Sequence, residues 1–177
     1  MFAFPNTSRW AAVFLYAALT ACAIDEDRHA KFDPSDVTWS KAHGRNTIAG
    51  VAALGVDSGK TRTCASLPVR LAPDSDYTRQ RISNLYGDEN RGFVNARHAQ
   101  QLRAKAATDT RYERSLKASV CDRQGHFAFR NLPDGTYYVL APVVWKNKLG
   151  EVAEGGFFMQ RVTVTGGETK RITLAAR

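Results

Sequence analysis

The chain has 177 residues, with 25 Lys or Arg against 17 Asp or Glu, which gives a formal net charge of +8. This length suits one domain with an ordinary buried core, and we expect no second domain. The positive charge favours encounter with anionic partners and says nothing about the fold.

The N-terminal segment resembles a bacterial lipoprotein signal. An apolar stretch from Trp10 to Ala21 ends in the sequence Leu-Thr-Ala-Cys at Cys22. It is shorter than the about 20 apolar residues of a membrane-spanning helix but suits the core of an export signal. We therefore predict a signal peptide at residues 1–21 and lipid attachment at Cys22. Ordinary cleavage after Ala23 is the alternative, and both interpretations export the chain.

Acylation of Cys22 would anchor the chain in a membrane, because several acyl chains together give durable attachment. Residues 22–41 are rich in charge and poor in apolar periodicity, so we expect a tether. The predicted location is the bacterial cell envelope, on a membrane and facing the periplasm or the exterior. A soluble periplasmic or secreted protein is the alternative. Acidic glycans, lipids and envelope proteins are the partners expected there, whereas nucleic acid suits this compartment less well.

Two further cysteines, Cys64 and Cys121, remain when Cys22 is set aside. In an exported protein, a disulfide bond between them is the natural expectation. It would stabilise the fold by roughly 4 kcal/mol in the chain-entropy model. Two separate buried thiols are the alternative.

Beyond residue 42, apolar residues alternate with period two more often than with the period of a helix. One strand is predicted from Ile48 to Leu54 and another from Leu67 to Leu71, where Pro68 indicates an edge position or a bulge. The sequence from Gly59 to Thr61 between them is typical of a hairpin turn.

A segment at about residues 77–114 is too long for an ordinary strand connection and is predicted to be a helical insertion. Its first helix should run from Tyr77 to Tyr86, capped by one of residues 74–76 and ended by Gly87. A second helix is predicted from His98 to Ala107.

This insertion concentrates positive charge, with eight basic and four acidic side chains and hence 8 − 4 = +4. We take Arg97, Arg103 and Lys105 as candidate contacts for an anionic envelope component. A solvated helical surface that covers part of a sheet is the alternative interpretation.

The C-terminal third carries the clearest strand pattern. Turn sequences at Cys121–Gly125 and Asn131–Gly135 each precede a strand. The second of these strands, Thr136–Trp145, is apolar on both faces and should lie near the centre of a sheet. Phe157–Val164 and Lys170–Leu174 are predicted to form a hairpin across a Gly-Gly turn.

Three short sequences mark turns and strands in this third, GHFAF at residues 125–129, LPDGTY at residues 132–137 and GET at residues 167–169. They resemble the carboxypeptidase regulatory-like superfamily of transthyretin-like, or prealbumin-like, domains. The resemblance implies a mainly β, Ig-like antiparallel β-sandwich over residues 42–177, interrupted by the helical insertion. It implies an accessory or binding unit and says little about activity.

Catalytic and metal-binding patterns are not recognisable in the sequence. The four histidines lack the spacing of a ligand pair, and no G-x-S-x-G sequence occurs. We therefore expect no enzyme activity, no cofactor and no metal. A non-catalytic binding or structural module is the predicted function, and the alternatives are a subunit of a larger envelope assembly and a hydrolase with an unrecognised site.

Trp145 and Phe157 are candidates for an aromatic platform that contacts a ligand, because they flank the loop after the long strand. Packing in the interior of the sandwich is the alternative for both side chains.

Overall fold

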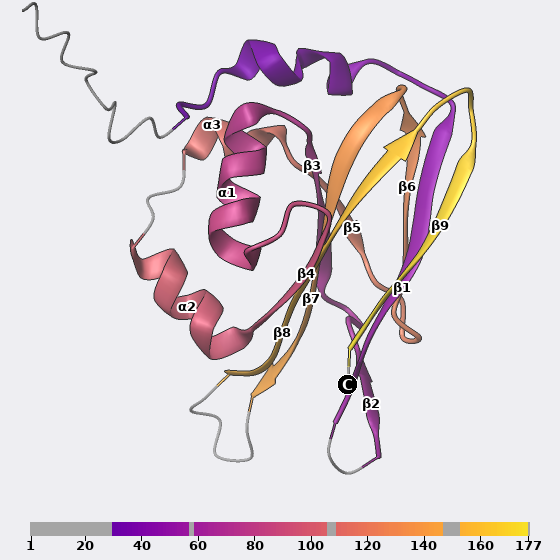
Figure 1. Cartoon of the computed structure of the whole chain (residues 1–177). Coiled ribbons are helices and arrows are strands. Elements are labelled where there is room, and N and C mark those ends of the chain that lie inside the picture. Colours follow the sequence, from indigo (N-terminus) through magenta and orange to yellow (C-terminus); the bar gives the residue numbers. More distant parts are fainter. Residues whose placement is uncertain (1–29, 57–58, 106–108, 147–152, 177) are drawn as a thin grey trace, which may run out of the picture.

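The computed structural model describes residues 30–56, 59–105, 109–146 and 153–176, with the side chains of residues 103–105 outside this description. Two β-sheets pack face to face, and helices cover the outer face of one of them (Figure 1). Strands pair in antiparallel fashion except for β1 (Asn46–Gly55) and β9 (Thr169–Ala176), which run parallel. The prediction of a mainly β sandwich with a helical insertion is confirmed.

The first sheet is built around β1. Its partner β9 runs along residues 47–54 of β1, while β6 (His126–Leu132) and β2 (Thr61–Thr63) pair with successive parts of β1. Because β9 occupies one edge of β1 over this whole length, β6 and β2 share the other edge. Apolar residues of β1 alternate between the interior and the outer surface, as the sequence predicts.

The second sheet has the strand order β4-β8-β7-β3-β5. Its strands are β3 (Pro68–Pro73), β4 (Arg91–Asn95), β5 (Lys117–Val120), β7 (Gly135–Lys146) and β8 (Ala153–Val164). The long strand predicted from residue 136 to residue 145 is β7, and its central place is confirmed. The edge position predicted from Pro68 is wrong, because β3 lies between β7 and β5. Pro68 is the first residue of β3, a position where its missing N–H is tolerated.

The hairpin predicted from the last two strands is also wrong. β8 belongs to the second sheet and β9 to the first, so the turn between them crosses the sandwich. Asn46 secures this crossing, because its Oδ1 accepts hydrogen bonds from the backbone N–H groups of Gly167 (2.7 Å) and Glu168 (2.9 Å). The Gly-Gly sequence specifies a turn but not the sheet into which the chain returns.

The main hydrophobic core lies between the sheets. Phe127 and Phe129 from the first sheet and Tyr137, Val139 and Phe158 from the second belong to it. The predicted disulfide between Cys64 and Cys121 is confirmed, with Cα atoms 5.7 Å apart and both residues buried in this core.

Helices pack on the outer face of the second sheet (Figure 1). They are the 3-10 helix η1 (Pro34–Lys41) and the α-helices α1 (Asp76–Tyr86), α2 (Ala96–Lys105) and α3 (Thr110–Ser115). A second core joins them to the sheet through Phe32, Val37, Ala72, Ile82, Tyr112, Tyr138 and Met159.

The first predicted helix is confirmed in its caps as well as its length. Ser75 accepts a hydrogen bond from the Thr78 N–H, and Gly87 ends α1 with a left-handed φ of 71°. The second helix begins at Ala96, two residues before the predicted start. Between the two helices the chain forms β4, a strand that the helical prediction for residues 77–114 does not include.

The tether predicted at residues 22–41 differs from the structure over its last part. Residues 34–41 form η1, and Phe32 and Val37 are only 4% and 1% exposed. The Phe32 ring packs edge-on against Tyr112 at 5.5 Å, so burial of these apolar side chains outweighs the charged composition of the segment. The predicted signal peptide and Cys22 lie outside the described residues. Within the described part of the chain, no helix is long and apolar enough to cross a membrane.

Candidate functional site

The basic residues proposed as contacts belong to α2. Arg97 is exposed on the first turn of this helix. Arg103 and Lys105 lie on the same helix, but their side chains are outside the described part. The structure therefore shows an accessible Arg97 and leaves the three-residue contact as a prediction.

The aromatic platform predicted from Trp145 and Phe157 is not formed. In the β7–β8 pair, Trp145 stands opposite Glu154 and Pro142 stands opposite Phe157. Because side chains alternate along a strand, residues 154 and 157 of β8 point to opposite faces of the sheet. Trp145 packs against the core between the sheets, whereas Phe157 lies two residues before Met159 on the face of β8 that carries the second core.

Trp145 instead has polar partners from neighbouring strands. Its indole Nε1 donates a hydrogen bond to Glu154 Oε2 at 2.6 Å. The guanidinium carbon of Arg62 lies over the ring, 5.4 Å from its centroid. Gly155 has a φ of 83°, and a Cβ there would come within 2.6 Å of a ring carbon of Trp145. The backbone of β8 can therefore lie directly against the indole.

We call Arg62, Trp145 and Glu154 the Trp145 cluster. Arg62 comes from β2 in the first sheet, whereas the other two residues come from β7 and β8 in the second. Arg62 and Glu154 are exposed and Trp145 is partly buried. An aromatic surface beside a guanidinium donor and a carboxylate acceptor suits a ligand that has an apolar face and several hydroxyl groups.

A separate hollow of about 270 Å³ lies between η1 and α3. We call it the η1–α3 groove. The residues that line it are Phe32, Pro34, Val37, Lys41, Arg111, Arg114 and Ser115. Its floor is apolar, since Phe32 and Val37 are buried. Every charged side chain in the lining is a cation.

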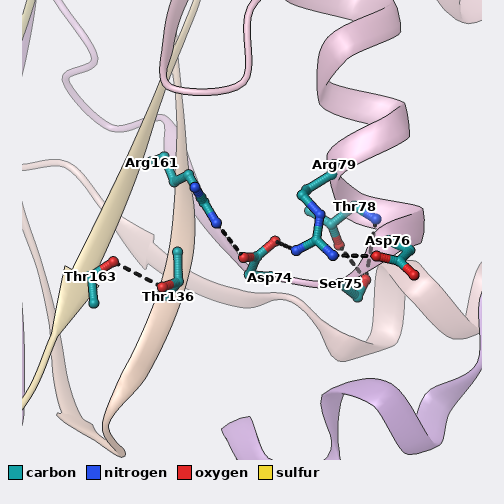
Figure 2. A network of polar contacts seen from close by, with 8 residues as sticks. All are labelled: Asp74, Ser75, Asp76, Thr78, Arg79, Thr136, Arg161 and Thr163. Atoms are coloured by element: carbon teal, nitrogen blue, oxygen red, sulfur yellow. Dashed lines mark hydrogen bonds and ion pairs between the residues drawn. The ribbon is translucent and has the colours of Figure 1, made fainter.

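A network of charged side chains joins α1 to the second sheet (Figure 2). The two carboxylate oxygens of Asp74 accept hydrogen bonds from Arg79 Nη1 at 2.7 Å and from Arg161 Nη2 at 2.8 Å. Arg79 also pairs with Asp76. The hydrogen bond to Asp74 is the main cause that raises the pKa of Arg161 above its usual value.

This network is best explained as structural. Asp74 is largely buried, with a side chain 12% exposed, and each of its oxygens is engaged by a guanidinium. Tyr138 lies beneath the guanidinium of Arg161, whose central carbon is 5.9 Å from the ring centroid. Burial raises the pKa of Tyr138, so its hydroxyl stays neutral at physiological pH.

The described residues contain no group of three or more His, Cys, Asp or Glu side chains that could hold a metal ion. His126 approaches one carboxylate, Asp122 Oδ2, at 3.1 Å. The backbone N–H of the same histidine is the main cause that lowers the pKa of Asp122. This pair closes the turn before β6 and is an exposed local contact.

Protein-family models and curated proteins give no match to the chain. A solved structure from Pseudomonas aeruginosa, described as a "putative carbohydrate binding protein", is similar in fold. The match has a TM-score of 0.66 and 22% sequence identity, and it covers 82% of this chain and 97% of that chain. At this identity the similarity shows the β-sandwich fold alone. The resemblance to the carboxypeptidase regulatory-like superfamily stays a prediction.

Proposed function

We propose that this chain is a non-catalytic carbohydrate-binding module that is exported to the bacterial cell envelope and held there by a lipid on Cys22. The observation that carries the binding proposal is the Trp145 cluster. It joins an indole ring to an exposed carboxylate at 2.6 Å and to an exposed guanidinium. The similar fold of a protein described as carbohydrate binding supports the same class of ligand.

The chemistry of the cluster suits a sugar. A pyranose ring presents C–H groups on one face, which can pack against the part of the indole that Arg62 and the β8 backbone leave exposed, and hydroxyl groups at its rim. Glu154 can hold the indole N–H and still accept a hydrogen bond from a hydroxyl, because a carboxylate has about four acceptor sites. Arg62 can donate to another hydroxyl or pair with an acidic sugar.

Glycan binding is tested by titrating the intrinsic fluorescence of the protein with peptidoglycan-derived oligosaccharides, alginate and neutral glucans. We expect quenching by at least one of these and an affinity loss of about tenfold for Glu154→Gln, since a hydrogen bond to a charged group contributes about 1.5–3 kcal/mol. Glu168→Gln is the matched control, because Glu168 caps a distant turn through Thr165. Equal affinity for both variants, or no quenching by any glycan, would contradict the proposal.

Lipid attachment is tested separately by metabolic labelling with a radioactive fatty acid. We expect the wild-type chain to be labelled and to fractionate with membranes. Cys22→Ala should lose both properties. A labelled Cys22→Ala chain, or an unlabelled wild-type chain, would refute the anchor and leave the glycan site untouched.

A further inference from the structure

Two carboxylates, Asp33 and Asp109, lie beside the η1–α3 groove but do not line it. Asp33 accepts hydrogen bonds from the Ser35 N–H and hydroxyl at 2.8 Å each, and so caps η1. Asp109 caps α3 through the Arg111 N–H and binds the Arg111 guanidinium at 2.7 Å, which lowers the pKa of Asp109 to about 2. Both carboxylates are engaged at helix starts, and neither lines the groove.

Lys41 and Arg114 are the groove cations best placed to meet an outside ligand. Both are exposed, and each lies near the C-terminal end of its helix. Arg114 Nε donates to the Thr110 carbonyl at 3.3 Å, which holds the side chain along α3. Its terminal nitrogens and the Lys41 ammonium remain the natural partners of an anion.

The position of the groove matters as much as its charge. Phe32, on its floor, follows Cys22 by ten positions in the chain. A fully extended chain of that length reaches at most about 35 Å. If Cys22 carries the proposed lipid, the groove therefore stays within this distance of the bilayer surface.

We propose that the η1–α3 groove binds the phosphate headgroup of an anionic phospholipid in the membrane to which the chain is attached. Lys41 and Arg114 bind the phosphate oxygens, and the apolar floor contacts C–H groups of the glycerol beside the phosphate. The contact fixes the orientation of the domain, so that the helical layer faces the bilayer. It rests on the proposed lipid attachment at Cys22 and not on glycan binding at the Trp145 cluster.

The test measures partition of the full chain, carrying Cys22→Ala, between buffer and two kinds of vesicle. One is phosphatidylcholine, and the other also contains phosphatidylglycerol. The readout is the ratio of the two partition coefficients, because the apolar contribution of the N-terminal segment is common to both vesicles and cancels. The chain with no change other than Cys22→Ala should prefer the anionic vesicle, and added salt should reduce this preference.

The decisive comparison uses two pairs of substitutions with the same change in charge. Lys41→Gln with Arg114→Gln should lower the ratio about 30-fold, since each cation near an anionic surface contributes about 1 kcal/mol. Lys170→Gln with Arg171→Gln, on exposed positions of β9 in the other sheet, should leave it unchanged. Thermal unfolding of both variants checks that they are folded. Equal loss in the two pairs would overturn the proposal, because it would show attraction without a site.

Two further measurements distinguish a phospholipid from a free anion and from an acidic glycan as the ligand of the groove. Inorganic phosphate that binds the groove while the vesicle ratio stays near one would indicate a site for a free anion and would overturn the membrane contact. Alginate binding that is lost with Lys41 and Arg114, without change in the vesicle ratio, would assign the groove to an acidic glycan instead. Glu154→Gln should leave the vesicle ratio unchanged, so failure of the glycan site and failure of this contact are distinguishable.

Discussion

Asp74 and Arg161 form the link between the start of α1 and strand β8, with Asp74 Oδ2 and Arg161 Nη2 2.8 Å apart. The other oxygen of the same carboxylate binds Arg79 on α1. One largely buried carboxylate thus joins two cations from elements that are far apart in the sequence (Figure 2). The helical layer is fixed to the sheet by this contact as well as by apolar packing.

We expect Asp74→Ala to lower the free energy of unfolding by about 2–3 kcal/mol, because it leaves two guanidinium groups without their shared partner. Asp76→Ala is the control, since Asp76 pairs with the same Arg79 but its side chain is 85% exposed. The control should cost about 0.5 kcal/mol, as surface ion pairs do. Urea unfolding measures both, and equal losses would show that burial of Asp74 does not matter.

Asn46 is the second polar residue on which the fold depends. It is 1% exposed, and its amide nitrogen donates to the Leu132 carbonyl and to Asp134 Oδ1. Asn46→Asp should cost about 3 kcal/mol or more, because a carboxylate cannot donate and would face Asp134. The same substitution at Asn95, whose Oδ1 accepts from the His98 N–H, should be nearly neutral, since Asp is an equally good N-cap. Comparable destabilisation by the two changes would refute this account.

Because of the disulfide, we expect the oxidised chain and the cysteine-free chain to differ measurably in their free energy of unfolding. Its loop closes over a sequence separation of 57 residues, for which the chain-entropy model gives about 4 kcal/mol. Cys64→Ala combined with Cys121→Ala should lower the free energy of unfolding by about that amount. Reduction of the wild-type chain should have a similar effect. Unchanged stability in the double variant would exclude a stabilising role for the bond.

Tyr112 gives the fold a defined sensitivity to alkali. Burial raises the pKa of its hydroxyl to about 12 in the folded chain, against about 10 when unfolded. Stability is therefore complete below pH 10 and falls as pH rises towards 12, because only the unfolded chain ionises in this window. The slope should be about 1.4 kcal/mol per pH unit from this residue. The stability of Tyr112→Phe should fall less steeply with pH, by that amount. Parallel pH profiles of the variant and the wild type would contradict the assignment.

The long, regular parts of the fold could be predicted from the sequence. α1 is an example, because Ser75 and Gly87 supply a cap and a stop at the right spacing. β4 could not be predicted, because only Val94 of this short strand is buried and one apolar position gives no alternating pattern. η1 was obscured because charged residues surround the buried Phe32 and Val37.

Of the residues in the candidate site, the sequence predicted only one. Trp145 was recognisable as an aromatic residue at a strand end, but its partners depend on strand register. The β7–β8 pairing places Glu154 opposite Trp145 and turns Phe157 to the other face. Arg62 comes from a different sheet, and no local sequence pattern connects it to Trp145.

The central claim, glycan binding at the Trp145 cluster, is tested most directly by nuclear magnetic resonance of the indole N–H groups. Of the three tryptophans in the chain, Trp10 lies in the predicted signal peptide. The mature chain therefore keeps Trp39 and Trp145, and each gives one indole signal. On titration with the glycan that quenches fluorescence, we expect the Trp145 signal to move, because its N–H bonds to Glu154. The Trp39 signal should stay in place, since that ring packs against Tyr137 at 5.1 Å. Saturable glycan binding with an unmoved Trp145 signal would contradict the account.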